Sequence, residues 1–163
     1  MKSCARIQSL FLSLTVAAGF SACSNLDAAP EPPGPPPALP EHNPTGVYRR
    51  TFTIGRGWKS HRVWLHLGGA ESVHAVYLND RFVGYGTDSR LPSEYDITDH
   101  LVAGKNHLAI VVVRYSAQSY VEDQDQWWMA GLHRSVWIEA RPRVSIGDVE
   151  AVADFDVRSG RGF

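Results

Sequence analysis

Hydrophobic and polar side chains alternate along several stretches in the middle of the chain. In the stretch 47–54, Tyr48, Phe52 and Ile54 occupy every second position, and Arg50 is the one polar member of that series. A repeat of two residues that is rich in aromatic and β-branched side chains is typical of a β-strand. The same reasoning predicts further strands at 63–67, 73–78, 81–83 and 134–140.

Another stretch, 107–115, is apolar on both of its faces, which favours a strand inside a sandwich. Asn79 and Asp80 separate two strands, and because both residue types tolerate positive φ we expect a two-residue hairpin turn there. Only 96–101 suggests a helical turn, with Asp96 or Thr98 as its cap. At least six short strands in about 100 residues predict an all-β fold, a β-sandwich or jelly roll.

The first 23 residues have the composition of a targeting segment. Lys2 and Arg6 give a short positive start, a mostly apolar stretch follows at 7–20, and small residues precede Cys23. The apolar stretch is shorter than the roughly 20 residues of a membrane span. We therefore predict a secretory signal peptide at 1–23.

This segment also resembles a bacterial lipoprotein signal, in which the cysteine becomes the lipidated first residue. Cys23 is then the predicted lipidation site, and a lipid group would anchor the domain to a membrane without a spanning helix. The alternative is ordinary cleavage near the same place, with Cys23 a bystander. The expected location is secreted or periplasmic, as a membrane-anchored lipoprotein.

A proline-rich stretch follows the leader. Seven of the eleven positions 30–40 are proline, and such a run favours the extended polyproline II form and cannot pack a core. We interpret 24–42 as a semi-rigid linker. A ligand for an SH3-type domain is a poor alternative in a secreted chain.

Composition narrows the functional classes. Lys and Arg number 16 and Asp and Glu number 17, so the near-balanced charge argues against a nucleic-acid partner and against membrane contact other than through a lipid anchor. Both cysteines, Cys4 and Cys23, lie in the leader, which leaves no disulfide framework and no cysteine zinc site. A chain of 163 residues is too short for a (β/α)8 barrel of about 250 residues.

Several blocks taken together resemble one family. Their order and spacing are similar to the N-terminal sugar-binding jelly-roll domain of glycoside hydrolase family 2, and specifically of the large bacterial β-galactosidases. The resemblance covers 43–142 and implies a galactose-binding-like β-sandwich. The blocks are Asn43–Tyr48, Gly84–Thr98, Gly104–Ala109, Tyr120–Trp127 and Ala130–Val136.

The resemblance also implies what this chain lacks. The segment 143–163 resembles the first strand of the family's next domain, an immunoglobulin-like sandwich, and is too short to form it. The two catalytic glutamates of the family belong to a barrel domain and match no residue here, so we assign no catalytic residue. Glu122 with Asp123 or Asp125 could be considered as a substitute for the two catalytic glutamates, but this pair lacks the apolar pocket that would raise the pKa of one carboxyl group.

Asp125 is the one binding residue that the resemblance assigns. In the resembled β-galactosidases the matching position contacts the galactosyl group and a sodium ion, so Asp125 is a candidate for substrate and sodium binding in the full-length context, and no other cofactor is expected. The alternative is a solvated acidic loop. A further family contact residue, an Asn upstream of the Asn43 block, is replaced here by the proline-rich linker, and Gln126-Trp127-Trp128 stands where Met-Trp-Arg is usual.

Other candidate residues have plainer interpretations. Trp127, Trp128, Tyr115 and Tyr120 could form an aromatic sugar platform, but core and interdomain packing is favoured. The seven histidines show no helical ligand pair. Arg90 and Arg134 are expected in salt bridges that fix loops, and the two strand tryptophans, 64 and 137, in packing.

Three functions follow from these observations. The first is a non-catalytic carbohydrate-binding domain of a β-galactosidase-like enzyme, active only with the missing catalytic domains or subunits. The second is a free-standing, tethered, lectin-like module that binds galactosides, and the third is an assembly scaffold. We also expect marginal stability for the isolated domain, because surfaces that the family covers would be exposed.

Overall fold

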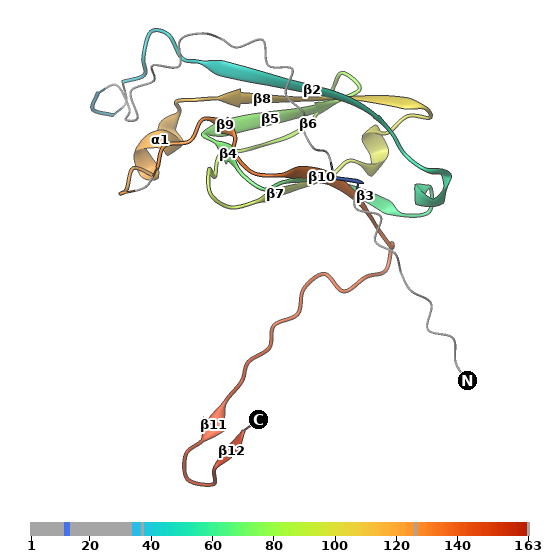
Figure 1. The fold of residues 1–163 in the computed structure, drawn as a ribbon, viewed down its shortest axis with the longest axis vertical. Coiled ribbons are helices and arrows are strands. Elements are labelled where there is room, and N and C mark those ends of the chain that lie inside the picture. The colour runs from blue at the N-terminus through green and yellow to red at the C-terminus, as the bar shows by residue number, and fades with distance from the viewer. Residues whose placement is uncertain (1–11, 14–33, 37, 126, 163) are drawn as a thin grey trace.

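The computed structural model describes residues 12–13, 34–36, 38–125 and 127–162. The strands up to β10 build a sandwich of two antiparallel sheets (Figure 1). The first sheet has the order β1-β10-β3-β7 and the second has the order β2-β8-β5-β6. The first consists of β1 (Leu12–Ser13), β10 (Val136–Arg141), β3 (Arg62–Leu67) and β7 (Ser93–Asp96), and the second of β2 (Thr45–Thr53), β8 (Lys105–Val113), β5 (Val73–Leu78) and β6 (Arg81–Gly86).

Two small ribbons complete the strands. The pair β4 (Ala70–Glu71) and β9 (Gly131–Leu132) lies at one end of the sandwich, and β11 (Phe155–Asp156) pairs with β12 (Arg161–Gly162) in the C-terminal segment. The predicted all-β sandwich is confirmed. The six strands expected from the alternating pattern are all present, and the pattern missed only the short ones.

The core lies between the two sheets because every second residue of the strands points inward. In β8 the inward residues are buried and the outward ones from Ala109 to Val113 are half-buried, so this strand is fully buried on one face and not on both. The buried core consists of Phe52, Val63, Leu65, Leu67, Ala70, Val76, Leu78, Ile97, Leu108, Ile110, Val112, Val136 and Ile138.

The predicted hairpin turn joins β5 to β6. Asn79 and Asp80 have φ values of 52° and 62°, the pair of positive angles that a type I′ turn requires. The Asn79 side chain also donates to the His100 carbonyl at 2.8 Å and accepts from the His107 backbone N–H at 2.9 Å. One residue therefore shapes the turn and joins it to the neighbouring loops.

The expectation of a single helical turn was wrong. The predicted turn exists as η2 (Thr98–His100), but its N-cap is Ile97 and no side chain caps it, so the expectation of Asp96 or Thr98 as the cap was wrong. The Asp96 carboxylate accepts instead from the backbone N–H of Thr98, two residues on, at 3.0 Å. Two further turns are η1 (Arg56–Trp58) and α1 (Ala117–Val121). Each is too short to display a helical period, which is why the pattern did not indicate them.

The outer face of the first sheet is polar and well partnered. Trp137 stacks on His66 with ring centroids 3.6 Å apart, and the guanidinium of Arg141 lies 5.0 Å from the centre of the Trp64 ring. Arg141 also pairs with Glu94 at 2.6 Å. The two strand tryptophans thus pack on the surface of the sandwich and not in its core.

The outer face of the second sheet carries an apolar patch beside polar positions, which include Arg49, Thr51 and His107. Val47, Val111, Ala75 and Tyr85 lie opposite one another on four successive strands, and Val47 and Tyr85 are 53% and 68% exposed. Tyr77 and Phe82 extend the same face, with ring centroids 5.5 Å apart. The two outer faces therefore differ in what they can bind.

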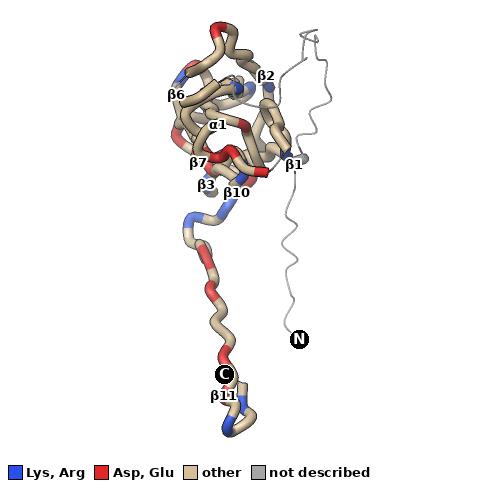
Figure 2. Tube along the Cα trace, turned by 90° about the vertical axis from the view of Figure 1, so that its left-hand side faces the viewer, with Lys and Arg blue, Asp and Glu red and all other residues tan. Residues whose placement is uncertain are grey.

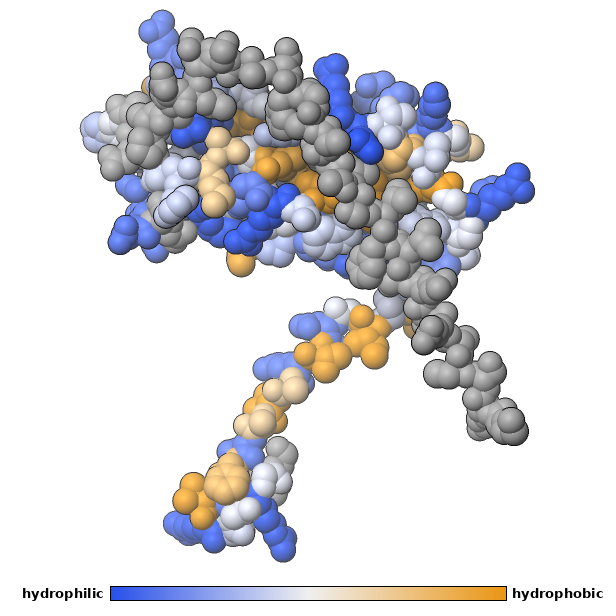
Figure 3. All heavy atoms as spheres, viewed as in Figure 1, coloured by the Kyte–Doolittle hydropathy of each residue, from blue (hydrophilic) through white to orange (hydrophobic). Residues whose placement is uncertain are grey.

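The chain continues beyond β10 as an extended segment. Figure 3 shows apolar side chains along it, and they include Val144, Ile146 and Val149, which are 93%, 81% and 74% exposed. The predicted signal peptide and Cys23 lie outside the described residues, apart from Leu12 and Ser13. Across the described part of the chain, no helix combines the length and apolar character needed to cross a bilayer.

Candidate functional site

The loops that carry most of the family-like blocks gather at one end of the sandwich. The chain leaves β6 at Gly86 and enters β7 at Ser93, while β8 ends at Val113 and β2 begins opposite it at Thr45. The β4–β9 ribbon and α1 lie at this same end (Figure 1). Figure 2 looks onto it, with α1 and acidic positions facing the viewer.

The first block, Asn43-Pro44, fixes the entry to β2. The Asn43 amide donates to the Tyr115 carbonyl at 2.7 Å and accepts from the Tyr115 backbone N–H at 3.0 Å. The Arg114 backbone N–H donates to the Pro44 carbonyl at 3.0 Å. These bonds continue the β2–β8 ladder past the strand ends, so the chain beyond β8 starts from a fixed position.

The helix α1 then redirects the chain. Ser116 and Ser119 form a capping box at its N-terminus. The Ser116 hydroxyl accepts from the Gln118 N–H at 3.2 Å, and the Ser119 hydroxyl accepts from the Ser116 N–H at 3.1 Å. The Ser116 hydroxyl also accepts from Ser72 at 2.9 Å. Because α1 ends at Val121, residues Glu122–Asp125, which we call the acidic run, begin directly after it.

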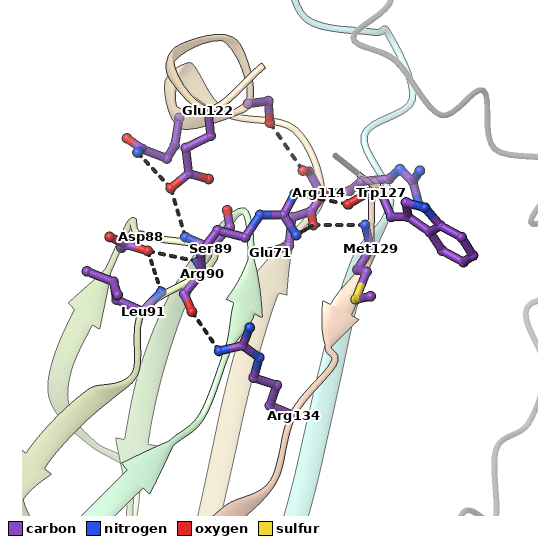
Figure 4. Close-up of polar contacts among 12 residues, drawn as sticks. Glu71, Asp88, Ser89, Arg90, Leu91, Arg114, Glu122, Trp127, Met129 and Arg134 are labelled. Carbon is purple, nitrogen blue, oxygen red and sulfur yellow. Dashed lines mark hydrogen bonds and ion pairs between the residues drawn. The ribbon is translucent and has the colours of Figure 1, made fainter. Parts of the chain in front are cut away.

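The acidic run divides into an inward and an outward part. The Glu122 carboxylate accepts from the Ser89 backbone N–H at 3.0 Å and from the Gln118 amide at 2.9 Å (Figure 4). Asp123 and Asp125 are exposed. The chain bends at residues 124 and 125, so Asp123 and Asp125 do not lie on one straight extended segment.

An ion pair between the half-buried Arg90 and the buried Glu71 lies beneath the run. Glu71 is only 4% exposed, and its Oε2 accepts from the Met129 backbone N–H at 2.9 Å and lies 3.4 Å from Nη1 of Arg90. Burial raises the pKa of Glu71, and the bond from Met129 and the charges of Arg90 and Arg114 oppose that rise. The predicted loop-fixing salt bridge of Arg90 is therefore present.

Arg90 is held by its backbone as well as its side chain. Its N–H donates to Asp88 at 2.8 Å, its carbonyl accepts from Arg134 at 2.9 Å, and its Nη2 donates to the Trp127 carbonyl at 3.0 Å. Figure 4 shows these contacts converging on Arg90 from three loops. Arg134 thus fixes a loop through a backbone carbonyl and not through the expected ion pair.

The four aromatic candidates do not share one surface. Tyr115 is 7% exposed, with the Arg114 guanidinium 5.2 Å from its ring centre, whereas Trp127 is 84% exposed. Tyr120 and Trp128 are half-buried. The described residues therefore offer Trp127 as a single exposed ring beside the acidic run.

A cation would find an incomplete site at Asp125. Within the described residues, no group of three or more His, Cys, Asp or Glu side chains could hold a metal ion. Sodium binds through several oxygen atoms, and the exposed Asp125 supplies one carboxylate. A sodium ion at Asp125 would thus need further oxygen ligands besides this carboxylate.

Reasoning from the sequence missed the residues that support the run. Glu71 bonds to Met129, 58 positions away, and Ser89 bonds to Glu122, 33 positions away. Asp88 holds the backbone of Arg90, which bonds to the loop in turn. The Gly84–Thr98 block contained Asp88 and Ser89 without indicating their partners. Chemically, the arrangement presents two carboxylates and one indole on a braced loop, which suits hydrogen bonding to sugar hydroxyls and stacking on a pyranose ring.

Comparison with known proteins agrees with this geometry. Residues 31–142 match the family described as "Glycosyl hydrolases family 2, sugar binding domain". The chain is similar to a β-galactosidase of Psychromonas ingrahamii, with 42% identity over 127 residues, and to one of Alteromonas mediterranea, with 44% identity over 121 residues. These alignments cover 78% and 74% of this chain and 12% of each relative.

A solved structure shows the same architecture. The chain superposes on a β-glucuronidase of Bacteroides uniformis with a TM-score of 0.57 and 29% identity, over 62% of this chain and 12% of that one. The chain thus spans about 12% of the length of the curated relatives that it matches.

Proposed function

The chain belongs to the family of sugar-binding domains of family 2 glycosyl hydrolases, and on that premise we propose that it binds β-galactosides through the loop that carries Asp125. The observation that supports this most directly is the division of the acidic run: Glu122 is engaged in bracing the loop, whereas Asp123 and Asp125 are exposed. A carboxylate on a braced loop accepts hydroxyl hydrogen bonds without first being ordered, which lowers the cost of binding.

We assign this domain no hydrolytic step of its own. Cleavage of a glycosidic bond requires an acid and a nucleophile or base on either side of the bond. The two acidic side chains beneath the loop, Glu71 and Glu122, are committed to structural hydrogen bonds. Turnover of galactosides, and any sodium site at Asp125, would then depend on catalytic domains or subunits that complete the site.

Calorimetric titration of the full chain with methyl β-galactoside tests the proposal. We expect measurable heat at millimolar sugar and its loss in Asp125→Asn, because an amide replaces one acceptor with a donor. The matched control is Asp148→Asn, which changes an exposed aspartate of the C-terminal segment and should leave the heat unchanged. Absence of heat with the unmodified chain would remove the galactoside proposal, and hydrolysis of a chromogenic galactoside would overturn the inactive assignment.

We also propose export and anchoring. The leader 1–23 would direct the chain out of the cytoplasm, and lipid on Cys23 would hold it to a membrane through the 24–42 linker. Metabolic labelling with a fatty acid should mark the chain that carries Cys23 and should not mark the Cys23→Ser variant. Equal labelling of both would leave ordinary cleavage as the better interpretation.

The apolar patch on the outer face of the second sheet favours the scaffold as a second candidate. A face that carries Val47, Tyr77, Phe82 and Tyr85 in exposed positions is suited to packing against another domain. If the chain associates with the catalytic part of such an enzyme and shows no heat with any sugar, the scaffold is the better assignment. A lectin-like module predicts the opposite result.

A further inference from the structure

We propose that Arg90 is a positioning residue for the sugar-binding loop, a role that rests on the proposed galactoside binding. Asp123 and Asp125 lie between two anchors, at Glu122 and at Trp127. At the first anchor, Glu122 accepts from the Ser89 backbone N–H at 3.0 Å, and Ser89 is the neighbour of Arg90. At the second anchor, the Trp127 carbonyl accepts from Nη2 of Arg90 at 3.0 Å.

The second anchor consists of two contacts that the Arg90–Glu71 ion pair makes with the chain after the acidic run, one with Trp127 and one with Met129. Nη1 of Arg90 lies 3.4 Å from Oε2 of Glu71, and that same oxygen accepts from the Met129 backbone N–H at 2.9 Å. The guanidinium fork thus spans a buried carboxylate on β4 and a carbonyl of the acidic loop. Only arginine offers donors in this planar arrangement, because lysine carries a single ammonium group.

The backbone of Arg90 is held by hydrogen bonds of its own, separate from the side-chain bond to the loop. Asp88 accepts from its N–H at 2.8 Å, and Arg134 donates to its carbonyl at 2.9 Å. Glu122 and Trp127, on either side of the two aspartates, therefore both bond to the same short stretch, Ser89-Arg90. Because Asp123 and Asp125 lie between these attachments, Arg90 sets where their carboxylates are presented without touching the sugar.

Two variants and one control separate positioning from general stability. Arg90→Gln removes the charge and the fork, and Arg90→Lys keeps the charge and removes the fork. The control is Arg62→Gln, which breaks another arginine ion pair, the 2.8 Å contact with Asp96. Arg62 lies at the start of β3, far from the Asp125 loop, whereas the end of β3 at Leu67 lies next to the loops. Hydrogen exchange of single amides and calorimetric titration with methyl β-galactoside are the two measurements.

We expect the amide of Met129 and that of Ser89 to exchange about tenfold faster in both Arg90 variants, while the core amide of Ile110 stays within about twofold of the unmodified chain. The galactoside dissociation constant should rise about tenfold in both. Arg62→Gln should change neither quantity. Lysine should not rescue the loop, since charge alone does not provide the fork.

Three results would overturn the proposal. Unchanged exchange at Met129 would show that the loop is held without Arg90, and equal acceleration at Ile110 would show a general loss of stability. Full rescue by Arg90→Lys would show that charge suffices. If the unmodified chain binds no galactoside, the proposed function fails, and the exchange data still decide whether Arg90 holds the loop.

Discussion

Asn43 shows how much one side chain contributes at the end of a ladder. Its amide bonds to both the carbonyl and the N–H of Tyr115 in a partly buried position. We expect Asn43→Ala to lower the free energy of unfolding by about 2 kcal/mol, because two buried backbone groups lose their partner. Urea unfolding measures this, and Thr45→Ala, which removes one exposed bond, should cost less than about 0.5 kcal/mol.

Glu94 makes stability depend on acidity at the residue scale. Hydrogen bonds from Arg141 at 2.6 and 3.1 Å, with a further contact from His66, lower the pKa of Glu94 below its usual value of 4.5. A lowered pKa means that the pair stabilises the fold above pH 4.5 and that this contribution is lost as the pH falls through the folded-state pKa.

The unfolding free energy of Glu94→Gln should therefore fall below that of the unmodified chain at neutral pH and approach it in acid. Chemical unfolding across the range from pH 3 to pH 7, buffered at constant ionic strength, follows this difference. Glu150→Gln, an exposed glutamate of the C-terminal segment, supplies the baseline. A difference that grows toward acid would contradict the sign.

At the scale of elements, the β5–β6 turn contains an avoidable strain. Asp80 has a φ of 62° and is exposed, and a residue with a Cβ pays for that conformation whereas glycine does not. Asp80→Gly should raise the free energy of unfolding by about 0.5 kcal/mol, and Asp80→Val should lower it by about 1 kcal/mol. Thermal melting distinguishes these, and a destabilising glycine would argue against the turn type.

The alternating pattern predicted the long strands because inward and outward positions of a strand repeat every two residues. It missed β7, β4 and β9, which are too short to show a period, and α1, whose capping box ends in Ser119 in place of the usual Glu or Gln. The supporting residues of the site were beyond reach for a different reason. Glu71 and Ser89 bond across 58 and 33 positions, and no local spacing encodes such a contact.

At the scale of the whole molecule, the two outer faces differ in their tendency to associate with another protein surface. We expect the isolated chain to self-associate through the second sheet, where Tyr85 is 68% exposed on the edge strand β6. Tyr85→Lys should shift sedimentation toward the monomer at concentrations where the unmodified chain associates. Val102→Lys changes an exposed residue of a loop and should leave the distribution as it was, so equal effects would argue against this face.

The direction of β10 has a consequence for how a second protein can be joined to this one. Val136 pairs with Leu67 beside the loops, and Arg141 pairs with Arg62 five positions along, which carries the chain roughly 17 Å along the sandwich from the loop end. A reporter or tag joined to the C-terminal segment would thus leave the end of the sandwich that carries Asp125 open. A hydrolase core fused at the same place would share a sugar with Asp125 only by curving back along the sandwich, or by approaching from a separate polypeptide.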